Sequence, residues 1–208
     1  MLIQAPEARE KVERVEDALI NAHKEKVALW FEMVTKAPQY AKPVTPTTRA
    51  GWIHDHLCPE VEAAVADIPG VFAHEALGFF ALSIDNEILM RLKYVGQGAP
   101  SNVATDQQKL LARQEYDEAM LAALGADPAL GLPTFLTCGY TLGDGELGRL
   151  EIRCDYKSNT LWSFDFYGGE AVSAPLHFHG MPEEALPALV KSNRKTGAEK
   201  GRDLAEEA

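Results

Sequence analysis

The chain has 208 residues, of which 46% are hydrophobic and 25% are charged, values close to the average of globular proteins. This balance argues against disordered, collagen-like and membrane-embedded classes, and no apolar run approaches the about 18 residues that a membrane-spanning helix needs. Because the first residues also lack the basic and apolar regions of a signal peptide, we expect a cytoplasmic protein that makes no membrane contact.

The charge is acidic, with 20 Lys and Arg against 31 Asp and Glu, and the excess is concentrated in residues 51–150. Binding along a nucleic acid requires a stripe of Lys and Arg, so we expect no long nucleic-acid footprint, whereas a compact anionic ligand stays open. The cysteines have neither disulfide nor zinc spacing and are expected to be reduced, mostly buried thiols: Cys58, Cys138 and Cys154.

Two helices are expected in the first third of the chain. Apolar residues at three- and four-residue steps predict a long helix over 6–35, whose polar first half we expect to be exposed. A Pro-rich stretch follows, and Pro46 suits the first turn of a second helix over about 47–66, which Pro59 disturbs. We divide the chain into an N-terminal helix with a Pro-rich linker, an α+β domain and a flexible charged tail: 1–44, 45–192 and 193–208.

Next in the chain, two alternating apolar runs over 79–84 and 88–95 predict a β-hairpin. A three-residue loop between them would pair Ile84 with Ile88 and align the apolar residues of both strands on one face. A loop leads from this hairpin into a third helix over 105–125, which opens with the spacing of a capping box and ends at a glycine.

Three further strands are predicted from alternating apolar residues: 134–142, 149–156 and 161–167. Pairing of Leu142 with Leu150 would set the register of the first two. The same register would place Cys138 opposite Cys154. A short helix over about 182–192 follows. The fold class is therefore α+β, with an antiparallel sheet of about five strands in two hairpin or meander units, packed against three or four helices.

Arg91 and Lys93 are isolated cations in an acidic stretch, and the strand period places them on one face. The plainer interpretation is pairing with nearby carboxylates, or exposure to solvent. The functional interpretation is an anion-binding pocket, in which an Arg fork and a Lys charge hold a phosphate or carboxylate. The following loop and helix start would then contribute Asn102 and Gln107 or Gln108.

His54, Asp55 and His56 look like a metal motif, but two residues apart on a helix the imidazoles point away from each other. The pairs that share a face are His54 with Cys58, and Trp52 with His56. A His and a Cys in that spacing suit a zinc site or a thiol–imidazole nucleophile, although a partly buried His beside a small thiol is the commoner arrangement.

His177 and His179 would project to one side of an extended segment, yet two ligands do not complete a metal site. A third would have to come from His54, Cys58 or Glu170. The sequence also lacks nucleotide-binding glycine loops, zinc-protease and serine-hydrolase motifs. A metal-dependent nuclease motif fails because Arg91 stands where that chemistry needs a carboxylate. We therefore predict no metal and no cofactor.

Four short runs carry a family resemblance: 49–56 (RAGWIHDH), 91–93 (RLK), 101–107 (SNVATDQ) and 136–140 (LTCGY). Together they resemble an uncharacterised bacterial family, similar over about 48–167, whose members tend to be encoded on prophages and other mobile elements near small helix-turn-helix regulators. The resemblance implies a toxin–antitoxin or phage-related locus and no particular activity. It does not cover the N-terminal helix, an insertion over 126–133 or the chain after 168.

The acidic surface, the exposed first half of the long helix and the lack of a complete catalytic motif favour a cytosolic protein-interaction module of a mobile-element or stress-response locus, binding a partner protein. The alternative is a metal-independent enzyme acting on phosphodiesters or nucleotides, such as a ribonuclease-like toxin. Its catalytic residues would be His54, His56, Arg91 and Lys93, and its ligand would also contact Asn102 and Gln107.

Overall fold

The computed structural model describes residues 2–41, 44–76, 78–95, 106–157 and 159–168, so the tail predicted over 193–208 lies outside the described residues. The helices are α1 (Ala5–Glu13), α2 (Glu16–Lys36), α3 (Pro38–Ala41), α4 (Pro46–Val65), α5 (Asp106–Ala112) and α6 (Glu118–Ala123), with a 3-10 turn at Pro128–Leu130. The strands are β1 (Val71–Ala76), β2 (Phe79–Ile84), β3 (Ile88–Tyr94), β4 (Thr134–Leu142), β5 (Leu147–Tyr156) and β6 (Asn159–Tyr167). Each helix in these residues is too short or too polar to span a bilayer.

The strands form one six-stranded mixed sheet in the order β1-β2-β3-β4-β5-β6. The predicted α+β class is confirmed, but the antiparallel sheet of about five strands is only partly correct, because β3 and β4 are parallel. The chain between them passes through α5 and α6 and returns to the same end of the sheet, which makes a parallel pair. The strand missed in the sequence is β1, where His74 and Glu75 interrupt the apolar pattern.

The single helix predicted over 6–35 is wrong, because a two-residue break separates α1 from α2. The break lets both helices bury apolar residues against the sheet, so the first half is not exposed. Three side chains of this region are fully buried: Ala8, Val12 and Val15. The segment before α1 is also held, since the Ile3 N–H donates to Thr134 Oγ1 at 2.9 Å. The domain boundary expected after residue 44 stays a prediction.

The third predicted helix, over 105–125, is also interrupted, and its expected start at Thr105 lies outside the described residues. Gln114 adopts a left-handed backbone conformation, with φ 59°, between α5 and α6. Its side-chain amide ties this break to the sheet, donating to the carbonyl oxygens of Phe135 and Asp155 at 2.9 Å each. It also accepts the Phe135 N–H at 2.8 Å. The sequence pattern does not reveal this break, because both pieces keep apolar residues at helical spacing.

The β2–β3 hairpin has the predicted register, with Ile84 paired to Ile88. The register predicted for β4 and β5 is wrong: Cys138 lies opposite Ile152 and not opposite Cys154. A register shift near the end of β4 allows a tighter turn than the sequence suggested and moves the ladder by two residues. The inward-facing residues remain the predicted ones, because a shift of two preserves the strand alternation. All three cysteines are free thiols.

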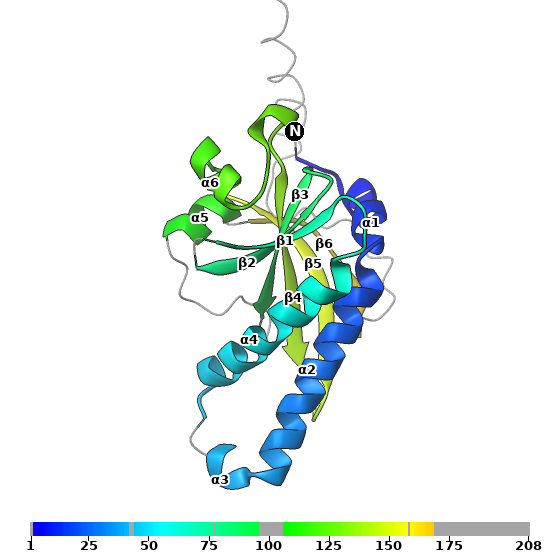
Figure 1. The fold of residues 1–208 in the computed structure, drawn as a ribbon, viewed down its shortest axis with the longest axis vertical. Helices are drawn as coiled ribbons and strands as arrows, with labels where there is room; N and C mark the ends of the chain where they lie inside the picture. Colours follow the sequence, from blue (N-terminus) through cyan, green and yellow to red (C-terminus); the bar gives the residue numbers. More distant parts are fainter. Residues whose placement is uncertain (1, 42–43, 77, 96–105, 158, 169–208) are drawn as a thin grey trace, which may run out of the picture.

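Helices cover both faces of the sheet, with α1, α2 and α4 on one and α5 and α6 on the other (Figure 1). Helices α1, α2 and α4 cover the larger hydrophobic core. The smaller core joins α5 and α6 to the middle strands through Ala81, Leu89, Phe135, Leu111 and Leu121. Alternation along β3 divides its side chains between the faces: Met90 and Leu92 face the larger core, so Arg91 and Lys93 share the face of α5 and α6.

Candidate functional site

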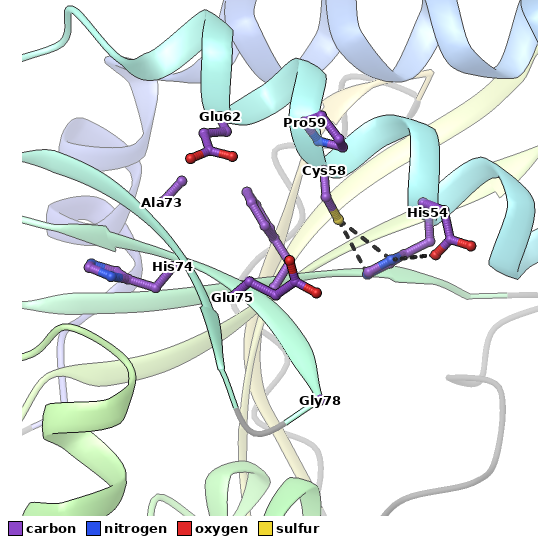
Figure 2. A pocket seen from close by; sticks show the side chains of 10 residues that line it. His54, Cys58, Pro59, Glu62, Ala73, His74, Glu75 and Gly78 are labelled. Atoms are coloured by element: carbon purple, nitrogen blue, oxygen red, sulfur yellow. Dashed lines mark hydrogen bonds and ion pairs between the residues drawn. The ribbon is translucent and has the colours of Figure 1, made fainter.

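A groove of about 600 Å³ lies between α4 and β1 (Figure 2). One wall comes from α4 through His54, Asp55, Cys58, Pro59 and Glu62. The other comes from β1, the following turn and β2 through Ala73, His74, Glu75, Gly78 and Phe80. The groove thus collects the Cys58 thiol, the His54 imidazole and three carboxylates at one edge of the sheet.

α4 forms close to the predicted range because its start is well capped. Thr45 Oγ1 accepts the Thr48 N–H at 3.1 Å, and Pro46 occupies the first turn. The buried stripe of the helix consists of Ile53, Leu57, Val61 and Val65. His54 and Cys58 each follow a residue of that stripe, so they lie at the border between the core and the groove.

The predicted face-sharing pair His54 and Cys58 is confirmed, with 3.5 Å between Cys58 Sγ and His54 Nδ1. Burial, with smaller contributions from the nearby carboxylates of Asp55 and Glu75, raises the pKa of the Cys58 thiol to about 12. Burial also lowers the pKa of His54, so both groups are neutral near pH 7. A nucleophilic cysteine needs a thiolate stabilised by a positive neighbour, and this environment does the opposite.

The carboxylates give the groove its charge. Asp55, Glu62 and Glu75 are all exposed, and none forms an ion pair with a Lys or Arg of the described residues. Among the described residues, the ionisable side chain nearest to this set is His54, whose Nδ1 lies 3.9 Å from the Asp55 carboxylate. The groove therefore presents negative charge that the described part of the chain does not neutralise.

β1 is an edge strand of the described sheet, with β2 on one side only. The Asp85 N–H donates to the Gly70 carbonyl at 2.8 Å, and the β1–β2 register continues from this pair. In an antiparallel ladder alternate residues bond to the partner, so the N–H and C=O groups of Ala73 and Glu75 point away from β2. The side chains of the same two residues line the groove.

His74 lies between these residues but is directed away from His54 and Cys58 (Figure 2). Its ring packs against Gly125 just after α6, where an added Cβ would lie 2.0 Å from the imidazole. The Nε2 atom of His74 is buried and has no hydrogen-bond partner among the described residues. His74 therefore joins β1 to α6 and leaves the groove chemistry to the side chains on the other face.

The remaining predicted histidine of this region, His56, belongs to a packing cluster. Its ring stacks on Trp52 with 3.9 Å between centroids, which confirms the predicted pair, and Trp52 in turn contacts Trp30. His56 Nδ1 lies 2.9 Å from the Trp52 carbonyl oxygen. Its position on the exposed side of α4 keeps it out of the groove.

The structure does not bring His54 or His56 together with Arg91 and Lys93. The first two lie on α4, and the basic pair projects from the other face of the sheet. Several predicted residues lie outside the described part of the chain: Asn102, Glu170, His177, His179 and the side chains of Gln107 and Gln108. The described residues contain no group of three or more His, Cys, Asp or Glu able to hold a metal.

The feature that sequence reasoning missed is the edge strand with Glu75 and the adjoining groove. The sequence signal that could have revealed this strand was the short run 71–76, which is separated from the predicted hairpin by two residues and so leaves room for a tight turn. Comparisons with family models, curated proteins and solved structures give no match for this chain. The bacterial family resemblance therefore stays a prediction.

Proposed function

We propose that the protein binds a partner protein by accepting an extended, basic segment as an additional strand beside β1. The observation that carries this proposal is the edge of β1 that no other described strand covers, where outward backbone groups of Ala73 and Glu75 adjoin a groove whose carboxylates pair with no described Lys or Arg. Strand addition gains affinity from main-chain hydrogen bonds and specificity from the pockets that receive alternate side chains.

The side chains of an added strand would alternate between the two faces of the sheet. Those opposite Ala73 and Glu75 would point into the groove, because opposed residues in a sheet share a face. There, Lys or Arg side chains would meet Glu62 and Glu75. On the other face the neighbour is Phe72, a large apolar side chain that is 60% exposed. The segment we propose therefore alternates basic and apolar residues.

The charge of the groove favours a basic segment over a second copy of this chain as the strand that pairs with β1. The protein has a net charge of -11, and the groove carries three carboxylates that pair with no Lys or Arg of the described residues. Pairing two β1 edges would bring like charges together, which destabilises the interface, whereas a basic segment is attracted by the same field.

We further propose that this module acts in the cytoplasm, in a mobile-element or stress-response locus of the toxin–antitoxin or phage-related type. The locus rests on the family resemblance alone. The alternative, a phosphodiester-cleaving enzyme, gains no support from the described groove, because the basic pair it requires projects from the opposite face.

The test is binding of a synthetic peptide that alternates Lys and Val, followed by amide hydrogen exchange of the full chain. We expect the peptide to slow exchange of the Ala73 and Glu75 amides, because these N–H groups gain acceptors. A peptide alternating Glu and Val, and a Lys–Val peptide with a central Pro, serve as charge and strand controls. Equal binding of either control contradicts the proposal.

Two variants separate the backbone and charge contributions. Ala73→Pro removes an outward N–H without removing a β1–β2 hydrogen bond, and we expect it to weaken peptide binding at least about tenfold. The double variant Glu62→Gln/Glu75→Gln should also weaken binding and reduce its salt dependence, whereas Glu118→Gln on α6 should not. Unchanged binding by Ala73→Pro, in a chain that still unfolds cooperatively, rules out strand addition at β1.

A further inference from the structure

The opposite face of the sheet carries three basic side chains in a small area. Arg91 lies opposite Thr137, and Thr137 lies opposite Arg153, so the three residues form one row across β3, β4 and β5. Lys93 is two residues from Arg91 on the same strand and shares its face. We name Arg91, Lys93 and Arg153 the basic cluster. It lies beside the apolar contacts of α5 and α6 and not beneath the groove.

Arg91 is held in a fixed orientation. Its Nε donates to Thr137 Oγ1 at 3.1 Å, and its guanidinium carbon lies 5.4 Å from the centroid of the Phe135 ring. The side chain is almost entirely buried, at 7% exposure. The Nη groups form no hydrogen bond with a described residue. A guanidinium that is already immobilised loses little conformational entropy when it binds an anion.

Two carboxylates on this part of the sheet form ion pairs with arginines other than Arg91. Asp155 lies 3.1 Å from Arg153 Nε and accepts the Thr160 hydroxyl at 2.9 Å. Glu151 lies 3.4 Å from Arg149. Among the described residues, neither Arg91 nor Lys93 has a carboxylate within ion-pair distance. Within the described residues, Arg91 and Lys93 therefore have no direct ionic partner, although the Asp155 carboxylate acts on Arg91 from a longer distance.

The burial of Arg91 and Lys93 close to each other lowers the pKa of both side chains. Burial lowers the pKa of Arg91 to about 10. Burial, together with the positive charges of Arg91 and Arg153, lowers the pKa of Lys93 to about 8. A bound anion would reverse these effects, because an opposite charge at contact distance favours the protonated forms.

We propose that Arg91 and Lys93 bind a phosphate group of a compact, phosphate-bearing small molecule. The planar guanidinium supplies directed donors to phosphate oxygens, and the ammonium of Lys93 supplies a second charge. The ligand has to be compact because the protein as a whole is acidic and would repel a long polyanion. This site is independent of the proposed strand acceptor, since it lies on the other face of the sheet.

The test is titration of the full chain with pyrophosphate and with inorganic phosphate, followed by NMR of the Arg91 Nε–H and the backbone amides of β3 to β5. We expect saturable shifts confined to this region. Lys93→Gln should weaken binding about tenfold or more, because it removes a charge-assisted hydrogen bond. The matched control Lys36→Gln removes an exposed charge on α2 and should leave the affinity unchanged.

Three results would overturn the proposal: no saturable shift with either probe, equal weakening by Lys93→Gln and Lys36→Gln, or equal affinity for citrate, which carries carboxylates only. Tighter binding of pyrophosphate than of inorganic phosphate would assign a diphosphate group, and the reverse order a monophosphate. Arg91→Lys provides a second variant that keeps the charge. It should lose affinity if the planar donors of Arg91 are required.

Discussion

The face of the sheet under α1, α2 and α4 carries the larger apolar core, which extends from β1 to β6 and leaves Glu75 at its edge, whereas the opposite face carries a smaller apolar core under α5 and α6. Beyond that cover, charged side chains of β3 and β5 share one surface, among them Arg91 and Arg153. One face thus holds most of the buried apolar side chains, and we expect substitutions there to lower stability more than substitutions on the other face.

The apolar face is not free of polar groups. His23 on α2 is fully buried, its Nδ1 lies 2.6 Å from the Leu19 carbonyl oxygen, and its ring meets Tyr140 edge-on at 5.1 Å. His23 Nε2, Tyr140 Oη and Arg49 Nε are buried without a hydrogen-bond partner among the described atoms. Of these groups, His23 gives the larger core a titratable side chain whose pKa burial lowers to about 4.

The largest effect is expected from truncating a fully buried leucine on each face. Leu57→Ala on α4 should lower the free energy of unfolding by about 3 kcal/mol. Leu121→Ala on α6 should cost about 2 kcal/mol, because two short helices can close over the space more readily than a long one. Urea denaturation measures both. A loss for Leu121→Ala as large as that for Leu57→Ala contradicts the asymmetry.

A second prediction concerns pH. Burial lowers the pKa of His23 from 6.5 to about 4. Between these values the unfolded chain binds a proton that the folded protein excludes, so stability falls as the pH is lowered through this window. The loss from this residue amounts to about 3 kcal/mol at pH 4 relative to pH 7. His23→Phe should flatten the dependence, measured by urea denaturation across pH, and an unchanged slope would contradict the prediction.

Gly125 tests the contact between α6 and β1. Its φ is 73°, and an added Cβ would collide with the His74 ring, whereas Gly145 has φ 90° and open space around it. Gly145→Ala therefore reports backbone strain alone, at about 1 kcal/mol, and Gly125→Ala should cost about 2 kcal/mol. Equal thermal shifts for the two variants would show that the His74 contact adds nothing.

The smallest effect is expected for the hydrogen bond between Arg91 and Thr137, on the face of the sheet that α5 and α6 cover. Thr137→Val keeps the shape of the side chain and removes the acceptor of Arg91 Nε, so we expect a loss of about 1 kcal/mol in urea denaturation. Thr141→Val on the same strand is the control, since its hydroxyl has no side-chain hydrogen bond among the described residues. A stabilising effect of Thr137→Val would mean that Arg91 does not depend on this acceptor.

Local patterns predicted the parts of the fold that depend on neighbouring residues. The α4 helix, the pairing of Ile84 with Ile88 and the proximity of His54 to Cys58 follow from capping, loop length and helical spacing. The predicted helix boundaries were wrong where contacts with residues distant in the sequence determine where a helix ends. Gln114 ends α5 through bonds to β4 and β5, and the break after α1 serves the burial of both helices against the sheet.

The candidate groove was only half visible in the sequence. His54 and Cys58 lie four residues apart, so their proximity could be read from spacing, but Glu75 joins them only because β1 runs along α4. Likewise, Arg91 and Lys93 were visible as a pair on one strand. Their neighbour Arg153 comes from β5, and no periodicity links residues so far apart in the chain.

The sequence by itself determined the α+β class, the acidic charge and the residues of most strands and of α4, because these depend on composition and on periods of two and 3.6 residues. The tertiary structure decided the parallel pairing of β3 and β4, the free edge beside an acidic groove and the separation of His54 from Arg91. Such features arise when side chains distant in sequence compete for the same buried space, and local pattern carries no information about that competition.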